Sequence, residues 1–403
     1  MSIKVGVASS SLIDTAQAGK TIAMEALAKA KVSQADFAFV FCSKEHDHDR
    51  FMEAVKSVLG NKTVIAGGSS MGVITNESVI NEGICAAIMV ISAPGIKFRT
   101  DITPGLIEGE EICGRKAGAK LKKMLKADNP NLLLFYDSVR PDIKDGIPFY
   151  QAAPILKGIE TEINQWPPVA GVGISTHSWT SCKLWNEKQI CSNSIMTLLV
   201  SGNIRMDTTI MHGCKPASDY HTITKISHNL ILEIDDKPAT QVVSEYLGNP
   251  EKVDWRSAMF FITLGMNKGE KYGPFKEEYY VNRMVMGVDD ETKGLALVEG
   301  DLLAGNEFQF MRRCIESGIV KERGIELVNS IGGRRPLFAL YISCAGRIRK
   351  IFGSEKEEAE EVQEAIGNIP LLGIYSGVEI AKVRGSIMPL DWTGVLCLFS
   401  EPL

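Results

Sequence analysis

Three segments of the sequence each combine a short apolar run, a glycine and then a hydroxyl side chain. The three are Val64–Gly67 followed by Gly68-Ser69-Ser70, Val169–Gly171 leading to Ser175, and Leu371–Gly373 leading to Tyr375-Ser376. In open α/β sheets, ligands collect outside the carboxyl ends of the strands, where a glycine lets backbone N–H groups approach them. We therefore predict one small-molecule pocket lined by the three segments. The alternative is that glycine and serine serve only turn geometry and helix capping.

Charged side chains near these segments could hold the ends of such a ligand. Two arginines could each form a bidentate salt bridge to a carboxylate: Arg347, which follows the Cys344-Ala345-Gly346 turn, and Arg283. Glu379 could pair with a ligand amine or with one of the arginines. Internal salt bridges or surface charges are the alternative for the two arginines. Cys344 itself ends an apolar run, where a thiol packs as a small hydrophobe.

A hydrolase is an alternative because Gly68-Ser69-Ser70-Met71-Gly72 fits the G-x-S-x-G pattern after a strand. Asp137 and His177 follow Ser70 in the order that such enzymes use. The nucleophile elbow also needs a helix after the serine. The next residues, Val73–Asn76, are poor helix starters because β-branched side chains lose rotamer freedom there. We therefore expect no catalytic residue.

Two further clusters have simpler explanations than metal binding. His46-Asp47-His48-Asp49 could bring two imidazoles to one ion, but it lies just before a helical pattern, where aspartate caps backbone N–H groups. We predict a capping loop and no metal site. The acidic run Glu355–Glu364 is expected to be the solvated face of a helix.

Strand and helix patterns alternate along the N-terminal half, which is typical of an α/β domain. The expected strands are Ile3–Ala8, Phe37–Cys42, Thr63–Ala66, Gly83–Ile91, Ile96–Ile102 and Asn131–Tyr136, and the expected helices are Asp14–Val32, Asp49–Leu59 and Gly109–Ala127.

The C-terminal half repeats this alternation after a middle segment of strands and turns. The expected elements are strands within Ser201–Gly248, a helix at Pro238–Leu247, a strand at Phe338–Ser343, a helix at Lys356–Ile366 and a strand at Gly394–Ser400. The sequence thus predicts two closely packed α/β domains, residues 1–220 and 221–403, with mixed sheets covered by helices.

Composition excludes several classes of protein. The 403 residues are 45% hydrophobic and 23% charged, which are ordinary values for a globular chain. A net charge of −5 argues against a nucleic-acid partner, which needs clustered Lys and Arg. The longest apolar stretch, Ile84–Ala93, is far shorter than the ~20 residues that cross a bilayer. Nine scattered cysteines without CxxC spacing and a start without a signal-peptide core favour a cytoplasmic protein with reduced thiols.

An ordered set of motifs resembles the FIST family, named for F-box and intracellular signal transduction proteins. Gly67–Ile74 stands where that family has Gly-Cys-Ser-Thr-x-Gly-Glu-Ile, and Pro370–Ile380 is similar to its Pro-Leu-x-Gly-Phe-Tyr-Thr-x-Gly-Glu-Ile segment. Further matches, in the family's order, are Met211–Pro216, Leu232–Ala239, Arg283 before Met286-Gly287-Val288, and Ser343–Arg347. Departures from the family pattern are Gly68 for Cys, Val73 for Glu, and Gly377-Val378 in the second segment, although Glu379 is kept.

The resemblance implies a sensory protein with a FIST N-like and a FIST C-like domain that binds an amino acid-like metabolite. Because the sequence shows no output domain, we expect a signalling partner such as a kinase or chemoreceptor; self-association stays open. The ligand-binding residues we predict are Gly67, Gly68, Ser69, Ser70, Ser175, Cys344, Arg347, Tyr375, Ser376 and Glu379.

Two other functions remain as alternatives. Some relatives bind haem and sense nitric oxide, so haem is an alternative cofactor, with His177, His212 and His221 as candidate axial ligands. A scaffold protein without any ligand is the other, and it would expose a large apolar interface.

Overall fold

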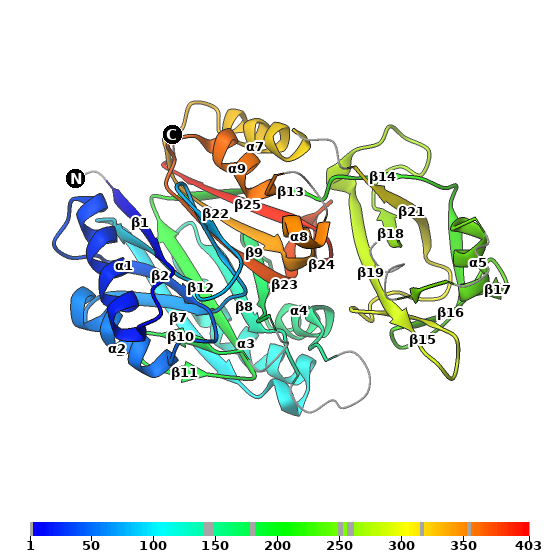
Figure 1. Ribbon diagram of the computed structural model, residues 1–403, viewed down its shortest axis with the longest axis horizontal. Coiled ribbons are helices and arrows are strands. Elements are labelled where there is room, and N and C mark those ends of the chain that lie inside the picture. Colours follow the sequence, from blue (N-terminus) through cyan, green and yellow to red (C-terminus); the bar gives the residue numbers. More distant parts are fainter. Residues whose placement is uncertain are drawn as a thin grey trace.

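The computed structural model describes residues 3–140, 148–177, 182–248, 253–255, 262–314, 318–352 and 356–402. Figure 1 shows a large lobe, which contains both ends of the chain, and a smaller lobe beside it. The chain leaves the large lobe after Met211, forms the small lobe from Cys214 to Arg313, and then returns to the large lobe.

The first sheet of the large lobe is covered by two N-terminal helices. Its strand order is β1 (Lys4–Ser10), β6 (Ala86–Ser92), β2 (Phe37–Cys42), β3 (Val64–Ser69), β10 (Leu184–Asn186) and β11 (Ile190–Cys191). Helices α1 (Thr15–Ala30) and α2 (His48–Leu59) pack their apolar side chains on its outer face. Asp14 and Asp47 cap these helices by accepting hydrogen bonds from backbone N–H groups of the first turn.

The second sheet joins N-terminal and C-terminal segments. Its order is β13 (Arg205–Met211), β25 (Gly394–Ser400), β22 (Pro336–Cys344), β23 (Leu371–Val383), β9 (Val169–Ile174), β8 (Asn131–Asp137), β12 (Ser194–Gly202) and β7 (Ile96–Pro104), with β4 (Val73–Thr75), β5 (Val79–Ile80) and β24 (Ser386–Leu390) at its side. Within this sheet β8 runs parallel to β9 and β22 parallel to β23, while the other pairs are antiparallel.

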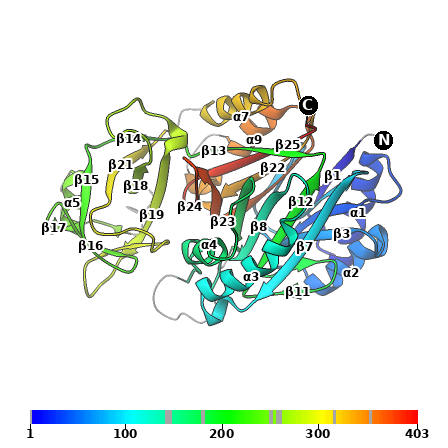
Figure 2. The same cartoon turned by 180° about the vertical axis from the view of Figure 1, so that it is seen from behind.

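Helices cover the outer face of this second sheet in two groups. Figure 2 shows α3 (Glu110–Met124) and α4 (Ala152–Glu160) over β8 and β12, and α7 (Ile319–Ser330) and α9 (Glu358–Ile366) near β22 and β25. The short elements η1 (Leu106–Glu108), η3 (Ala345–Arg347) and α8 (Arg349–Phe352) connect these layers to the strands.

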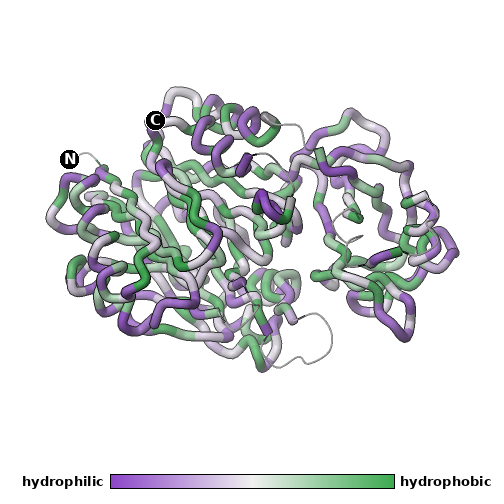
Figure 3. The backbone as a smooth tube through the Cα atoms, viewed as in Figure 1, coloured by the Kyte–Doolittle hydropathy of each residue, from purple (hydrophilic) through white to green (hydrophobic). Residues whose placement is uncertain are grey.

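The main core lies between the two sheets of the large lobe. Aromatic residues from β2 meet residues of the second sheet there: Phe37 stacks on Phe98 at 4.5 Å between ring centroids, and Phe41 lies 6.2 Å from Phe135. Figure 3 shows apolar residues along the strands and polar residues on many outer turns. Burying both faces of each sheet explains why β2 and β8 consist of buried residues throughout.

The small lobe is a closed barrel that the sequence patterns did not predict. Its ring consists of β21 (Glu307–Arg313), β15 (His221–Ser227), β16 (Leu230–Ile234), β20 (Leu295–Leu297), β19 (Tyr280–Val288) and β18 (Thr263–Asn267), and β18 pairs again with β21. Strands β14 (Cys214–Pro216) and β17 (Lys237–Pro238), η2 (Glu277–Tyr279) and α5 (Ala239–Tyr246) are attached to it.

The predicted α/β class with mixed sheets covered by helices is confirmed. Three predicted loops instead begin within strands, and β9 continues past Gly171 to Ile174. Strand β3 continues past Ala66 to Ser69 because Gly67 and Gly68 pair with β10, and β23 continues to Val383 through an irregularity between Ser376 and Val378. The predicted division at residue 220 remains a prediction, although the C-terminal segment returns to the sheet that the N-terminal segment builds.

Candidate functional site

Strand β23 brings together most of the predicted site residues. Ser376 on β23 lies opposite Cys344 of β22 and Ile174 of β9 in the sheet register. The backbone N–H of Tyr375 donates to the carbonyl of Gly72, which follows β3. The ends of β3, β9 and β22, which are distant in sequence, therefore meet beside the middle of β23. We call Ser70, Ser175, Cys344, Arg347, Tyr375, Ser376 and Glu379 the carboxyl-edge cluster.

The cluster is closed to solvent in this structure, since each of its seven side chains belongs to a residue that is at most 5% exposed. Ser70 donates to the Gly72 carbonyl at 2.6 Å, so its hydroxyl stabilises the turn that leads to β4. Ser175 lies against Gly377, where an added Cβ would come within 3.3 Å of the Ser175 Cβ. Gly377 thus allows β9 and β23 to approach closely.

Glu379 lies at the centre of a buried hydrogen-bond chain. Its Oε1 lies 2.5 Å from Ser376 Oγ, and its Oε2 accepts from the Thr393 N–H at 3.3 Å. Ser376 Oγ also lies 2.9 Å from the Ser343 carbonyl. A hydroxyl has one proton, so it can donate to only one of these two acceptors. Burial raises the pKa of Glu379 well above its usual range. A protonated Glu379 that donates to Ser376, which donates to Ser343, satisfies every group.

Arg347 forms an internal ion pair rather than presenting its guanidinium to solvent. Its Nη2 lies 2.7 Å from Glu358 Oε2, and its Nη1 donates to the carbonyls of His212 and Trp392 at 2.9 Å each. Although burial opposes the charged form, the Glu358 carboxylate holds the pKa of Arg347 above its usual range. The sequence predicted Glu358 on a solvated face; its side chain is only 14% exposed instead, because α9 begins beside Arg347. Residue 355 of that run lies outside the described ranges.

Three of the predicted residues lie within the first sheet. Gly67 faces Val40 and Trp185, and an added Cβ would come within 1.6 Å of the Val40 carbonyl oxygen. Gly68 lies against Ile174 of β9, and Ser69 exchanges hydrogen bonds with the Lys183 backbone. These residues hold β3 against β2 and β10, at the base of the cluster.

The remaining cluster residues, Cys344 and Tyr375, have packing roles. Cys344 is a free thiol that ends β22, and burial raises its pKa. The hydroxyl of Tyr375 lies 3.2 Å from Glu357 Oε2, and burial raises the pKa of this phenol as well.

Arg283 is also an internal residue. It is fully buried, and its Nε donates to Asp301 at 2.8 Å. Its Nη1 donates to the carbonyls of Asn282 and Pro389. Of the two readings of Arg283, an internal salt bridge is the one that the structure shows.

The hydrolase geometry is incomplete, because the residues after Gly72 form strand β4 and not the helix that a nucleophile elbow needs. Asp137 at the end of β8 accepts from the N–H groups of Val139 and Asn193. Burial raises the pKa of Asp137 to about 6.

Asp47 caps α2 as predicted, accepting from the Asp49 and Arg50 N–H groups at 3.1 Å each. The rings of His46 and His48 are buried against Phe51 and Trp185. Among the residues that the structure describes, no group of three or more His, Cys, Asp and Glu side chains is placed to hold a metal ion.

The three histidines considered for haem have different environments. Both ring nitrogens of His212 are engaged, with Nδ1 accepting from Cys214 N–H and Nε2 lying 3.0 Å from the Glu277 carbonyl. His221 bonds to Asp235 at 2.6 Å, and His177 is exposed.

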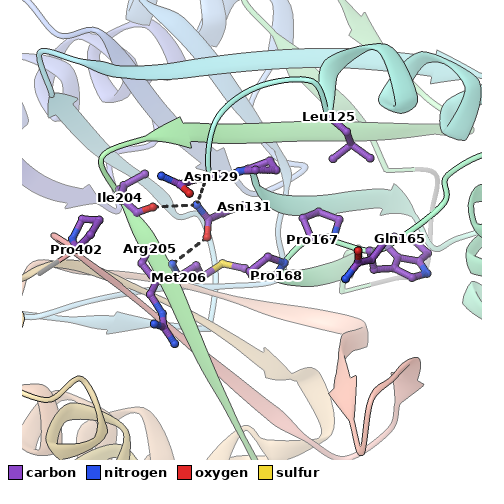
Figure 4. A pocket seen from close by; sticks show the side chains of 12 residues that line it. Leu125, Asn129, Asn131, Gln165, Pro167, Pro168, Ile204, Arg205, Met206 and Pro402 are labelled. Atoms are coloured by element: carbon purple, nitrogen blue, oxygen red, sulfur yellow. Dashed lines mark hydrogen bonds between the residues drawn. The ribbon is translucent and has the colours of Figure 1, made fainter.

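A cavity of about 540 Å³ lies at a different edge of the second sheet, and the sequence patterns did not indicate it. Leu125, residues 129–131, 165–168 and 204–206, and Pro402 line it (Figure 4). We call it the edge groove. The one available signal was compositional: Trp166-Pro167-Pro168 places an aromatic residue and two prolines directly before β9.

Comparisons with known proteins define the class. Residues 36–237 match the FIST N domain and residues 239–382 match the FIST C domain. The chain therefore belongs to the FIST family. FIST domains are sensor domains of signal transduction.

Similar proteins include two uncharacterized mycobacterial proteins. Mb0898c of Mycobacterium bovis is 23% identical over 252 residues, which are 62% of this chain and 64% of the relative. MT0656 of Mycobacterium tuberculosis is 18% identical over 61% of this chain and 64% of its own length. This chain thus spans about two thirds of the length of the relatives that it matches.

Solved structures resemble the chain weakly. A cyanuric acid hydrolase from A. caulinodans aligns over 100% of both chains with 8% identity and a TM-score of 0.41. Phosphoribosylformylglycinamidine synthase II from Thermotoga maritima aligns over 99% of this chain and 72% of its own, with 10% identity and a TM-score of 0.23. Both TM-scores lie below 0.5, and neither protein's reaction is carried over to this chain. Within the described ranges, every helix is too short or too polar to cross a bilayer.

Proposed function

We propose that this protein is a cytoplasmic sensor that binds an amino acid-like metabolite at the carboxyl-edge cluster and signals through a partner protein such as a kinase or chemoreceptor. The observation that supports this most directly is the buried Ser343–Ser376–Glu379 chain, which links β22, β23 and the turn at Thr393. A buried polar chain costs free energy and is expected where a function needs it.

The closed state of the cluster supports a switching role. A ligand can shift a conformational equilibrium only if it binds one state better than the other. Because the cluster residues are at most 5% exposed, a metabolite can reach them only after the surrounding segments open. The closed arrangement would then be the ligand-free state, and the opened one would be the state that the partner reads.

The protonation of Glu379 suggests which part of the ligand it contacts. A ligand ammonium group beside Glu379 favours the carboxylate, because an opposite charge lowers the pKa of an acid. Binding an amine-bearing metabolite would therefore favour release of the Glu379 proton. A ligand without a cationic group would release none.

A thermal-shift panel of amino acids and small carboxylates tests the proposal. A ligand at 100 times its Kd should stabilise the protein by ~2.7 kcal/mol. Glu379→Gln should abolish the response. The control is Glu299→Gln, since Glu299 is another buried glutamate but binds the Ala152 and Ala153 N–H groups outside the cluster. Absence of any shift in the wild-type protein, or equal responses of the two variants, would contradict the proposal. An absorption spectrum with haem supplied tests the haem alternative, which a Soret band would favour.

A further inference from the structure

The edge groove lies at the opposite end of β8 and β9 from the carboxyl-edge cluster. Asn131 begins β8 and Pro168 directly precedes β9, whereas Asp137 and Ile174 end these strands near the cluster. A volume of about 540 Å³ is in the range of cavities that bind small molecules. A ligand in this groove would not touch the carboxyl-edge cluster.

The walls of the groove are held in place before any ligand binds. Asn131 Nδ2 lies within 3.1–3.3 Å of the carbonyls of Asn129, Val200 and Ile204, and its Oδ1 accepts from the Met206 N–H at 2.9 Å (Figure 4). The Pro168 carbonyl accepts from the Leu132 N–H at 2.9 Å. The Asn131 amide therefore joins two of the lining segments and the Leu132–Pro168 backbone bond ties in a third, so that little conformational entropy is lost when a ligand binds.

The lining is more apolar than polar. Pro130, Pro167, Pro168 and Pro402 contribute to it and have no backbone N–H. Trp166 is half-buried, which leaves part of the indole available for a ligand ring. A ligand that fits this lining has a flat, apolar body.

Of the lining residues that the structure describes, one is charged. Arg205 is 61% exposed in its side chain, and its Nε donates to Asp207 Oδ1 at 3.2 Å. The other oxygen of Asp207 pairs with Arg334 Nη2 at 2.7 Å. Two guanidinium groups thus share one carboxylate, so these three side chains together carry one net positive charge. This bond uses Nε, so the two terminal amino groups of Arg205 can bind an anion.

We propose that the edge groove binds a small aromatic monocarboxylate, whose ring lies against Trp166 and the prolines and whose carboxylate pairs with Arg205. This site is independent of the metabolite site proposed above. The flat ring matches the apolar lining, and the single negative charge matches the one net positive charge of the Arg205, Asp207 and Arg334 side chains.

Titration calorimetry with indole-3-acetate and with its neutral analogue indole-3-acetamide tests the proposal. The acid should bind at least tenfold more tightly than the amide. Arg205→Gln should remove this difference and leave amide binding unchanged, while Trp166→Leu should weaken both ligands. The matched control is Arg335→Gln, because Arg335 is exposed at the same side of the sheet, pairs with Glu401, and does not line the groove. Arg205→Lys keeps the charge and should retain the preference for the acid.

Three results would overturn the proposal: no binding of either compound at millimolar concentration, equal affinity for acid and amide, or an Arg205→Gln variant that still prefers the acid. Thermal melts of each variant show whether it is folded, so that lost binding is not confused with lost structure. The Glu379→Gln variant distinguishes this site from the proposed metabolite site. It should lose the metabolite response but bind indole-3-acetate as the wild-type protein does.

Discussion

Glu379 is a carboxyl group whose surroundings favour its neutral form. The Ser376 hydroxyl cannot donate to both Glu379 and Ser343, and burial raises the pKa of Glu379. Glu379→Gln replaces the acid by a neutral group of the same shape, and the amide can donate to Ser376 and accept from Thr393. We expect the free energy of unfolding at pH 7 to change by less than ~1 kcal/mol in urea titration. A loss above ~2 kcal/mol would mean that the carboxylate is ionised in the ligand-free protein.

Arg347 and Glu358 form a buried ion pair, and removal of one partner leaves the other charge without compensation. Arg347→Leu should therefore cost ~3–5 kcal/mol, also because the carbonyls of His212 and Trp392 lose their donor. Arg335→Gln breaks an exposed pair with Glu401 and should cost less than ~1 kcal/mol. Similar losses in both variants, measured by chemical denaturation, would show that Arg347 is not structurally important.

Asp137 makes stability depend on pH. Burial raises its pKa from 3.8 to about 6, against the opposing effect of the Asn193 and Val139 N–H groups. Its stabilising contribution is complete below about pH 4 and is lost as the pH rises through about 6. The full loss corresponds to roughly 3 kcal/mol.

The asparagine of the Asp137→Asn variant does not titrate. The free energy of unfolding of the variant, relative to that of the wild-type protein, should therefore be roughly 2–3 kcal/mol higher at pH 7 than at pH 4. Unfolding measured at both pH values gives this difference. The buried histidines, whose pKa values are lowered, titrate in both proteins and cancel. A constant difference would contradict the assignment.

At the scale of single elements, the glycines in β3 allow a close approach to neighbouring strands. A side chain at these positions would push the strands apart. A Cβ on Gly67 would meet the Val40 carbonyl at 1.6 Å and the Trp185 indole at 2.7 Å. Gly67→Ala should lower the melting temperature strongly or abolish folding, because this backbone cannot move without disrupting β2. Gly287→Ala in β19, where nothing lies within 4 Å, is the matched control and should be tolerated. Equal melting temperatures of the Gly67→Ala and Gly287→Ala variants would show that the backbone of β3 can shift to accommodate the added Cβ.

The same glycines explain where sequence reasoning about elements was wrong. Glycine followed by serine is typical of a turn, so Gly67–Ser70 and Tyr375–Glu379 were expected to be loops. Pairing with β10 and with β9 keeps both segments extended. These partners lie more than a hundred residues away in sequence, so that local patterns could not reveal them. The apolar strands Phe37–Cys42 and Asn131–Tyr136 were predictable, because burial on both faces leaves a continuous hydrophobic run.

At the scale of the whole molecule, the sequence predicted the α/β class but not the barrel. Strand β23 pairs with β4 through Ile374 and Val73, which are about three hundred residues apart. The barrel is formed by the segment between the two parts of the chain that build the large lobe. The short, irregular strands of the barrel produce weak periodicity. The candidate site was partly predictable, since motifs placed residues on β3, β9, β22 and β23, but whether their polar groups face solvent or each other depends on tertiary packing.

The edge groove is likewise a binding site that local sequence patterns could not predict. Its lining comes from segments that precede strands and from Pro402 near the end of the chain. Prolines and one exposed arginine form no recognisable motif in sequence. Only the fold brings Trp166 and Arg205 to one cavity.

Hydrogen-exchange mass spectrometry with the metabolite selected by the thermal-shift panel tests the central claim most directly. The account predicts that the metabolite changes amide exchange in residues 70–75, 174–176 and 372–380, which meet at the carboxyl-edge cluster, and leaves residues 129–131 and 165–168 of the edge groove unchanged. The Glu379→Gln variant should show no change at any of these segments. Protection confined to the edge groove, or no change in any segment at saturating metabolite, would contradict the claim that the cluster is the sensory site.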